Sequence, residues 1–311
     1  MRSSKSRPPR AVLATTTLAL ALAACGGSSG SSSTAGSPAG GSSSNLAAAV
    51  KADPSLVAKV PKAISSDGII KSGTDATYAP NEFLAKDGKT VVGMDVDLFK
   101  AVAAKLGLKA EVSPAPFNAI IPGVSSGKYE IGVSSFTINK DREKQTNMVN
   151  YFSAGTQWAS KKGNPDNVDP NNACGKKIAV QKATVQADDV TARSAKCTST
   201  GKPAIQVVQY QGQDQATAAL VSGKDQAMLA DSPVIAYAVV QTHGQIQKLG
   251  AIYDSAPYGY VVAKKETAFA GALAGAVNAL MKDGTYKKIL DAWYVGDGAM
   301  SNSQVNPPAT S

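Results

Sequence analysis

Strand-like and helix-like segments alternate along most of this chain, and this order constrains the fold more than any other feature. Residues 69–72 predict a core strand, residues 95–106 place apolar side chains at helical spacing, and residues 108–112 predict a second strand. A helix over 117–126 and a strand over 129–135 follow. This β-α-β-α-β order implies a mostly parallel sheet with helices on both faces.

The same alternation starts again near Ser160. We expect strands over 177–180, 205–210, 226–230 and 258–263, and helices over 184–196, 214–222, 232–242, 267–281 and 285–294. Residues 46–66 predict a short helical or irregular lead-in, and residues 304–311 predict a disordered tail. With 311 residues, 43% of them hydrophobic, the chain is long enough for two α/β units with their own cores.

The first 24 residues have the pattern of a targeting signal. Four basic residues precede an apolar run over 11–24, which is shorter than the roughly 20 residues of a spanning helix. The run ends in Leu22-Ala23-Ala24-Cys25, which resembles a bacterial lipobox; the resemblance implies lipidation of Cys25 as the first mature residue. Residues 25–45 are then a flexible Gly/Ser tether. A plain secretory signal with a chance cysteine is the alternative.

Charge and composition give little support to several classes of function. Removal of residues 1–24 lowers the formal net charge from +9 to +5, and the remaining lysines are spread along the chain without interleaved aromatic residues. Nucleic-acid binding therefore has little support. The one histidine, His243, lies at a predicted helix end, so a nucleophile–histidine system would have only this base. We find no P-loop and no metal-ligand cluster in the sequence, and we expect no cofactor.

Cys174 and Cys197 remain once Cys25 is assigned to lipid. An exported chain permits a disulfide between them, and the loop that it closes is worth roughly 3 kcal/mol of stability. Two free buried thiols are the alternative.

Groups suited to a small zwitterion gather between Gly73 and Arg142. The run opens with Gly-Thr-Asp-Ala-Thr-Tyr-Ala-Pro at 73–80 and closes with Val-Ser-Ser-Phe-Thr-Ile-Asn-Lys-Asp-Arg at 133–142. A free amino acid needs donors for its carboxylate, a carboxylate for its ammonium group and a pocket for its side chain. Charge-assisted hydrogen bonds of this kind are worth about 1.5–3 kcal/mol each.

The order and spacing of these residues resemble the family 3 extracellular solute-binding proteins, the polar amino-acid receptors of ABC importers. The resemblance covers residues 67–295. It implies an α/β, two-lobed periplasmic-binding-protein-like type II fold, each lobe a mostly parallel sheet flanked by helices, joined by a two-crossing hinge. The expected parts are lobe 1 over 46–157, lobe 2 over 158–254, a return to lobe 1 over 255–300, and a disordered tail over 301–311. The crossings are expected near residues 155–161 and 253–259.

The resemblance implies that Arg142 binds the ligand carboxylate and Asp231 its ammonium group. Arg142 follows Asn139, which can cap a short helix, and its guanidinium can bind a carboxylate through two hydrogen bonds. The alternatives are a surface arginine paired with Glu143 or Asp141, and an Asp231 that only caps the helix opened by Ser232-Pro233.

The rest of the expected ligand shell also follows from the resemblance. Tyr78 and Phe117 match aromatic residues on either side of the ligand side chain, with ordinary core packing as the alternative, and Ser135 and Thr137 match contact positions. Asp75 matches an acid at the distal end of the ligand. In the second lobe the sequence departs from the family's Gly-Thr-Thr: it reads Ala183-Thr184-Val185, so we expect a contact from Thr184 and not from Val185.

The sequence therefore predicts a lipid-anchored, monomeric binding protein on the outer face of the cell membrane. It would capture a polar amino acid, glutamine or a basic one, by hinge closure and deliver it to ABC permease subunits. One alternative is an enzyme on the same scaffold, like the cyclohexadienyl dehydratases. Another is a sensory or adhesive lipoprotein that binds a ligand without transport.

Overall fold

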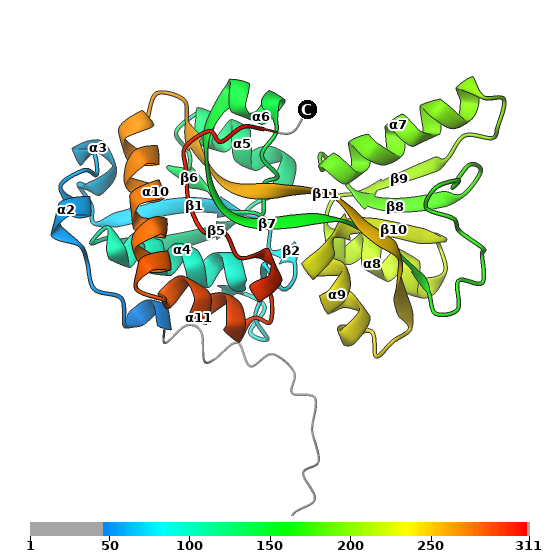
Figure 1. The fold of residues 1–311 in the computed structure, drawn as a ribbon, viewed down its shortest axis with the longest axis horizontal. Helices are drawn as coiled ribbons and strands as arrows, with labels where there is room; N and C mark the ends of the chain where they lie inside the picture. The colour runs from blue at the N-terminus through cyan, green and yellow to red at the C-terminus, as the bar shows by residue number, and fades with distance from the viewer. Residues whose placement is uncertain (1–45, 310–311) are drawn as a thin grey trace, which may run out of the picture. The chain divides into compact units, whose positions relative to one another are not determined.

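The computed structural model describes residues 46–309, and Figure 1 shows their ribbon. An eight-stranded sheet with the order β5-β1-β6-β11-β7-β10-β8-β9 organises the chain. Its strands are β1 (Ile69–Thr74), β5 (Lys109–Pro114), β6 (Ile131–Gly132), β7 (Thr146–Lys161), β8 (Lys177–Gln181), β9 (Gln206–Tyr210), β10 (Ala227–Asp231) and β11 (Ile246–Ala263). A smaller antiparallel sheet joins β2 (Thr77–Tyr78), β3 (Glu82–Leu84) and β4 (Val91–Val92).

The helices lie close to their predicted positions. They are α2 (Pro54–Val57), α3 (Lys62–Ser65), α4 (Met94–Lys105), α5 (Phe117–Ser125), α6 (Lys140–Gln145), α7 (Val185–Ser199), α8 (Gln213–Ser222), α9 (Ser232–Gln241), α10 (Thr267–Lys282), α11 (Thr285–Ala292) and the 3-10 turn η1 (Gly296–Gly298). Parallel pairing of β1 with β5 and β6, and of β8 with β9 and β10, confirms the predicted α/β class.

Clusters of buried hydrophobic side chains lie on both sides of the central strands. One contains side chains of β1, α4, α10 and α11, so the C-terminal helices pack in the same core as the first helices of the fold. The other side holds side chains of β8, β10, α7, α8 and α9. We call these the first and second lobes.

The long strands β7 and β11 run between the lobes, where the sequence predicted linkers (Figure 1). They pair antiparallel: Thr146 lies opposite Ala263 at one end of the ladder, and Lys161 lies opposite Ile246 at the other. The register is irregular on either side of Tyr253. The predicted strand over 258–263 is the last part of β11, and β7 was not predicted. Most of β7 is buried, including the polar Asn147, Asn150 and Gln157, so its sequence lacks the alternation of a half-buried strand.

A disulfide joins Cys174 to Cys197, with a Cα–Cα distance of 5.6 Å, and the predicted bridge is confirmed. It connects the segment before β8 to the C-terminal part of α7. Both cysteines belong to the second-lobe core.

The segment at 303–306 is ordered against β7 and differs from the predicted tail. Val305 forms an antiparallel bridge with Val149, the Asn306 amide donates to the Met148 carbonyl at 2.7 Å, and Ser303 Oγ donates to the Asn150 carbonyl. These backbone groups satisfy an edge of β7 that would otherwise lack partners, which is why the segment is held.

The predicted signal segment, Cys25 and the tether at 25–45 lie outside the described residues. Within residues 46–309, no helix combines the length and apolar character needed to cross a membrane.

Candidate functional site

One cavity lies between the carboxyl ends of the first-lobe strands and the N-terminal turn of α7. All eight residues predicted to contact ligand line it: Asp75, Tyr78, Phe117, Ser135, Thr137, Arg142, Thr184 and Asp231. The free space among them is about 10 Å³, roughly room for one water molecule, so the protein's own side chains nearly fill the cavity in this closed arrangement. Ligands of α/β sheets bind at such strand ends, because loops there can present polar groups without disturbing the sheet.

Arg142 enters the cavity from the first turn of α6. The Asn139 side chain accepts a hydrogen bond from the Arg142 amide at 2.9 Å, which confirms the predicted helix cap. The guanidinium donates to the Thr137 carbonyl at 2.8 Å and, across the lobes, to the Ala183 carbonyl at 3.3 Å. It lies over the rings of Phe117 and Phe136. Burial lowers the pKa of Arg142 to about 10, so the group remains a cation at neutral pH.

No salt bridge joins Arg142 to Asp141 or Glu143 within the described residues, so the surface-arginine interpretation is wrong. The guanidinium has five N–H donors, and among residues 46–309 carbonyl groups accept from two of them. The others are available to a carboxylate.

Asp231 ends β10 and faces the cavity from the second lobe. Its side chain makes no capping hydrogen bond to α9. The alternative interpretation, in which Asp231 only caps this helix, is therefore wrong. Its two oxygens accept from the Tyr78 hydroxyl and from Gln186 Nε2, each at 2.8 Å. Burial raises the pKa of Asp231, and the hydrogen bond from Tyr78 opposes that rise.

Asp75 directly follows β1 and is a buried residue of the cavity wall. Oδ1 accepts from the Thr77 amide and hydroxyl, and Oδ2 accepts from the Phe117 amide at 2.8 Å and from Gln181 Nε2 at 3.0 Å. Burial raises the pKa of Asp75, while these hydrogen bonds favour its carboxylate form.

The two predicted aromatic residues have different surroundings. The Phe117 ring stacks on Phe136 with 4.6 Å between centroids, beneath the Arg142 guanidinium. The Tyr78 ring packs with side chains of the second-lobe core, although the residue belongs to β2. Both remain in contact with the cavity.

A buried pair of carboxyl groups supports the first-lobe wall. Glu82 accepts from the hydroxyls of Ser134 and Ser135, and Asp95 accepts from the Ser135 amide at 2.9 Å. Ser135 has a φ of +50°, a left-handed conformation that is unusual for a residue with a side chain. Burial and the neighbouring Asp95 raise the pKa of Glu82 well above its usual range, which favours the protonated form of this side chain in the folded protein.

The N-terminal turn of α7 forms the second-lobe wall. Thr184 Oγ1 accepts from the Ala187 amide, so this hydroxyl caps the helix. Ala183 adopts a φ of +65°, the conformation that glycine would adopt most easily, and its carbonyl accepts from Arg142. Val185 lines the cavity as well, although we did not expect it there.

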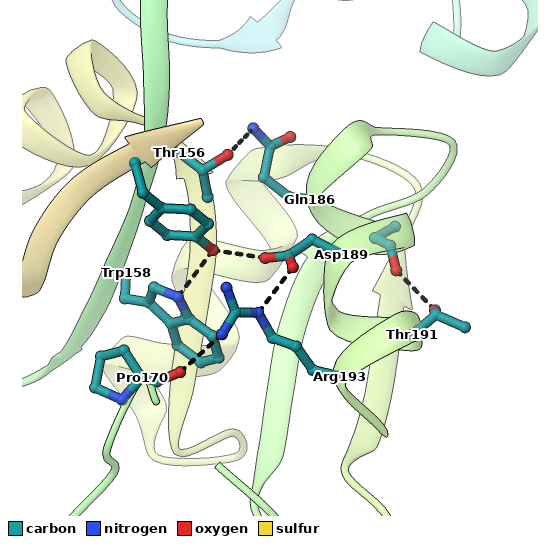
Figure 2. A network of polar contacts seen from close by, with 9 residues as sticks. Thr156, Trp158, Pro170, Gln186, Asp189, Thr191 and Arg193 are labelled. Atoms are coloured by element: carbon teal, nitrogen blue, oxygen red, sulfur yellow. Dashed lines mark hydrogen bonds and ion pairs between the residues drawn. The ribbon is translucent and has the colours of Figure 1, made fainter. Parts of the chain in front are cut away.

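Sequence analysis missed three further polar residues of the cavity: Ser134, Gln181 and Gln186. Figure 2 shows the Gln186 amide directed at Thr156 of β7, near the cluster in which Arg193 and Asp189 meet beside Trp158. Gln181 is the last residue of β8 and Gln186 lies in the first turn of α7. The position of Gln181 and Gln186 in the sequence could have identified them, because the ends of strands and the starts of helices in such sheets face ligands.

Within residues 46–309, no group of three or more His, Cys, Asp or Glu side chains is placed to hold a metal ion. The cavity is instead defined by one guanidinium, two carboxyl groups and several amides and hydroxyls.

Residues 70–296 match the bacterial extracellular solute-binding proteins, family 3. The chain belongs to this family. The match spans both lobes and every cavity residue named above. It agrees with the resemblance seen in the sequence, and the two-lobed type II architecture is confirmed by the solved structures described next.

Two curated relatives of this family 3 protein are arginine-binding proteins. The Arginine-binding protein ArgT of Corynebacterium glutamicum is 35% identical over 254 residues, which cover 81% of this chain and 83% of the relative. The L-arginine-binding protein of Pseudomonas aeruginosa is 28% identical over 246 residues, covering 76% of this chain and 92% of the relative.

Solved structures of ancestral proteins have the same fold. An ancestral arginine-binding protein, solved with glutamine and with arginine, is 32% identical and covers 73% of this chain and 98% of its own, with a TM-score of 0.67. The ancestral amino acid-binding protein AncCDT-1, described as a precursor of cyclohexadienyl dehydratase, is 30% identical over 75% of this chain and 98% of its own, with a TM-score of 0.65.

Proposed function

We propose that this protein is the extracytoplasmic receptor of an ABC importer and that its ligand is a basic amino acid, with arginine preferred. The observation that carries the proposal is the placement of Arg142 and Asp231, which enter one cavity from opposite lobes. A zwitterion supplies a carboxylate for the first and an ammonium group for the second.

The carboxylate end is assigned to Arg142. Its unused N–H donors can form the paired hydrogen bonds that a carboxylate accepts. The Phe117 ring below it excludes water, which strengthens these bonds.

The ammonium end is assigned to Asp231. Tyr78 and Gln186 donate to this carboxylate and hold it in place. An ammonium group would add a charged donor to this buried acid, beside the neutral donors Tyr78 and Gln186.

The distal end is assigned to Asp75. A carboxylate here favours a cationic side chain over an acidic one, because an acidic side chain would bring two like charges together. The names of the two arginine-binding relatives support arginine, and the ancestral structure solved with both arginine and glutamine supports glutamine as the second candidate.

Ligand entry requires the lobes to separate. Hydrogen bonds from Tyr78 to Asp231, from Gln181 to Asp75 and from Arg142 to Ala183 cross the cavity between them. The irregular pairing of β7 and β11 near Tyr253 is the proposed hinge, with the lobe boundaries near residues 157 and 254. Closure around the ligand would restore the surface that the permease recognises.

We also propose that Cys25 carries the lipid anchor and that residues 25–45 tether the lobes to the membrane. The predicted lipobox before Cys25 supports this assignment. Metabolic labelling with a radioactive fatty acid should label the wild-type protein and leave Cys25→Ser unlabelled; labelling of both would overturn the assignment.

The receptor proposal is tested by thermal unfolding of the purified protein with each of the twenty amino acids, ornithine and citrulline, followed by titration calorimetry. A ligand at a hundred-fold excess over its Kd should stabilise the native state by about 2.7 kcal/mol. We expect the largest shift with arginine. The absence of a shift with every compound would overturn the proposal.

An enzyme on this scaffold is the second candidate, supported by the similarity to a precursor of cyclohexadienyl dehydratase. Incubation with prephenate and with arogenate distinguishes the two functions. Product formation would favour the enzyme, whereas an arginine shift without product would favour the receptor.

A further inference from the structure

The hydrogen-bonding capacity of Asp75 is already filled by the protein. A carboxylate offers about four acceptor positions. The Thr77 amide and hydroxyl occupy Oδ1 at 3.1 and 2.6 Å, and the Phe117 amide and Gln181 Nε2 occupy Oδ2 at 2.8 and 3.0 Å. A ligand that reaches Asp75 must therefore replace one of these four donors.

Three of the donors are fixed in place. The amides of Thr77 and Phe117 belong to the backbone of β2 and α5. The Thr77 hydroxyl also accepts from the Gln213 amide at 3.0 Å, so it is held from both sides. Gln181 donates from the end of a long, rotatable side chain, and it is the one donor of the four that comes from the second lobe.

The Gln181 amide can interact with a ligand in either of two orientations. Its second N–H donates to the Gln211 carbonyl at 3.3 Å. Among residues 46–309, none donates a hydrogen bond to its Oε1, and the side chain is buried in the cavity wall. When Nε2 leaves Asp75, Oε1 can accept from an N–H of the ligand that takes its place.

We propose that Gln181 is a specificity-determining residue, which exchanges its bond to Asp75 for the distal N–H groups of the ligand. This inference rests on the proposed function and names the residue that distinguishes cationic from neutral distal ends. A guanidinium would donate to both Asp75 and Gln181 Oε1. A neutral ureido or amide group could replace Gln181 only by forming weaker hydrogen bonds. A ligand that displaced Gln181 but carried no distal donors would leave Asp75 with a vacant acceptor position.

Arginine and citrulline are the matched probes, because they have similar length and shape and differ in charge at the distal end. Gln181→Met keeps the length of the side chain and removes its polar atoms. Hydrogen bonds to charged groups are worth about 1.5–3 kcal/mol, so we expect arginine to bind at least about tenfold more weakly to this variant, with a smaller change for citrulline. Gln181→Glu restores an acceptor and adds a second negative charge, so arginine binding should recover and the preference for arginine over citrulline should exceed that of the wild type.

Gln211→Met is the matched control. Gln211 Nε2 donates to Asn118 Oδ1 at 3.0 Å, so it is also a glutamine amide that bonds to the first lobe, but on the exposed surface. The control should change each Kd by less than about twofold. Thermal unfolding without ligand identifies any variant that fails to fold, and Gln181→Glu then serves as the second test.

The outcomes separate the two proposals. If the wild-type protein binds arginine while Gln181→Met and Gln181→Glu leave both the arginine Kd and the arginine-to-citrulline ratio within about twofold, the role of Gln181 is overturned and the receptor function stands. An equal weakening of both ligands by both variants would mean a structural role and would also overturn it. If the wild-type protein binds neither probe, the proposed preference for a basic ligand fails first, and the Gln181 inference fails with it.

Discussion

The Tyr78 hydroxyl lies 2.8 Å from Asp231 Oδ2, although the two residues are 153 positions apart in the chain. The backbone amide of Asp231 donates back to the same hydroxyl at 3.1 Å. A side chain from β2 is thus bonded to the end of β10 and buried among second-lobe residues. This contact connects the two lobes at the acid that is proposed to bind the ligand ammonium group.

Tyr78→Phe removes the hydroxyl and keeps the ring. We expect the ligand to bind roughly tenfold more weakly, because a hydrogen bond to a charged group is worth about 1.5–3 kcal/mol and, of the side chains Tyr78 and Gln186, only Gln186 would still donate to Asp231. Titration calorimetry with arginine measures the effect.

Tyr237→Phe is the control for this prediction, since Tyr237 contacts Phe83 across the lobes with 6.0 Å between ring centroids but does not line the cavity. Equal losses in the two variants would contradict a specific role for the Tyr78–Asp231 bond.

Arg142→Met should abolish ligand binding and stabilise the ligand-free protein. Burial lowers the pKa of Arg142 from 12.5 to about 10. One pKa unit corresponds to about 1.4 kcal/mol, so the buried cation costs the ligand-free state about 3 kcal/mol. We expect the free energy of unfolding to rise by about 1–2 kcal/mol, because an apolar side chain of similar size carries no such cost.

Urea unfolding measures this change, and Arg193→Met is its control. Arg193 Nε lies 2.8 Å from Asp189 Oδ1 in the cluster of Figure 2, so its removal leaves that acid with fewer donors and should lower stability. A fall in stability for Arg142→Met as large as that for Arg193→Met would show that Arg142 is structural.

Glu82→Gln should change how stability depends on pH. Burial and Asp95 raise the pKa of Glu82 well above 4.5, so its contribution to stability is complete below about pH 4.5 and is lost as the pH rises toward the folded-state pKa. While the pH lies between the unfolded-state pKa and the raised folded-state pKa, the unfolded chain releases this proton and the folded protein keeps it. The wild type should therefore lose about 1.4 kcal/mol per pH unit relative to Glu82→Gln, which has no proton to release.

Urea unfolding at pH 5, 6 and 7 measures this difference. Glu111→Gln, at an exposed position of β5, should follow the wild type at all three values. A difference between the wild type and Glu82→Gln that stays constant with pH would mean that Glu82 is not protonated in the folded protein.

Gly155→Ala should destabilise the strands that join the lobes. An added Cβ would lie 2.5 Å from Ile252 Cγ2 and 2.7 Å from the Tyr253 carbonyl oxygen. Overpacking of this kind costs about 1–3 kcal/mol, which thermal unfolding can measure.

Gly271→Ala is the matched substitution in α10. A Cβ there has no neighbour within 4 Å, and the helix should gain about 0.5–1 kcal/mol. A Gly155→Ala protein as stable as the wild type would mean that β7 and β11 can shift apart at this point.

Local patterns determined much of the fold. The helices α4, α7, α8, α9 and α10 lie within a few residues of their predicted bounds, because their apolar positions recur at helical spacing and turn residues follow them. Asn139 could be assigned as a cap because its side chain acts on an amide three residues away. Arg142 and Asp231 could be predicted to bind the same ligand because they match the carboxylate-binding and ammonium-binding positions of the family.

Tertiary structure alone decided the rest. The burial of β7 depends on β10 and β11 on its two sides, so polar Asn147 and Asn150 interrupt its pattern without breaking the strand. Val305 is ordered because it forms an antiparallel bridge with Val149, and the residues next to Val305 in the sequence do not predict this pairing. Gln181 faces Asp75 only because the lobes bring the ends of β8 and β1 together across 106 residues of chain. Hydrogen bonds between distant strand ends depend on that arrangement in space, whereas a sequence pattern records only interactions between neighbours along the chain.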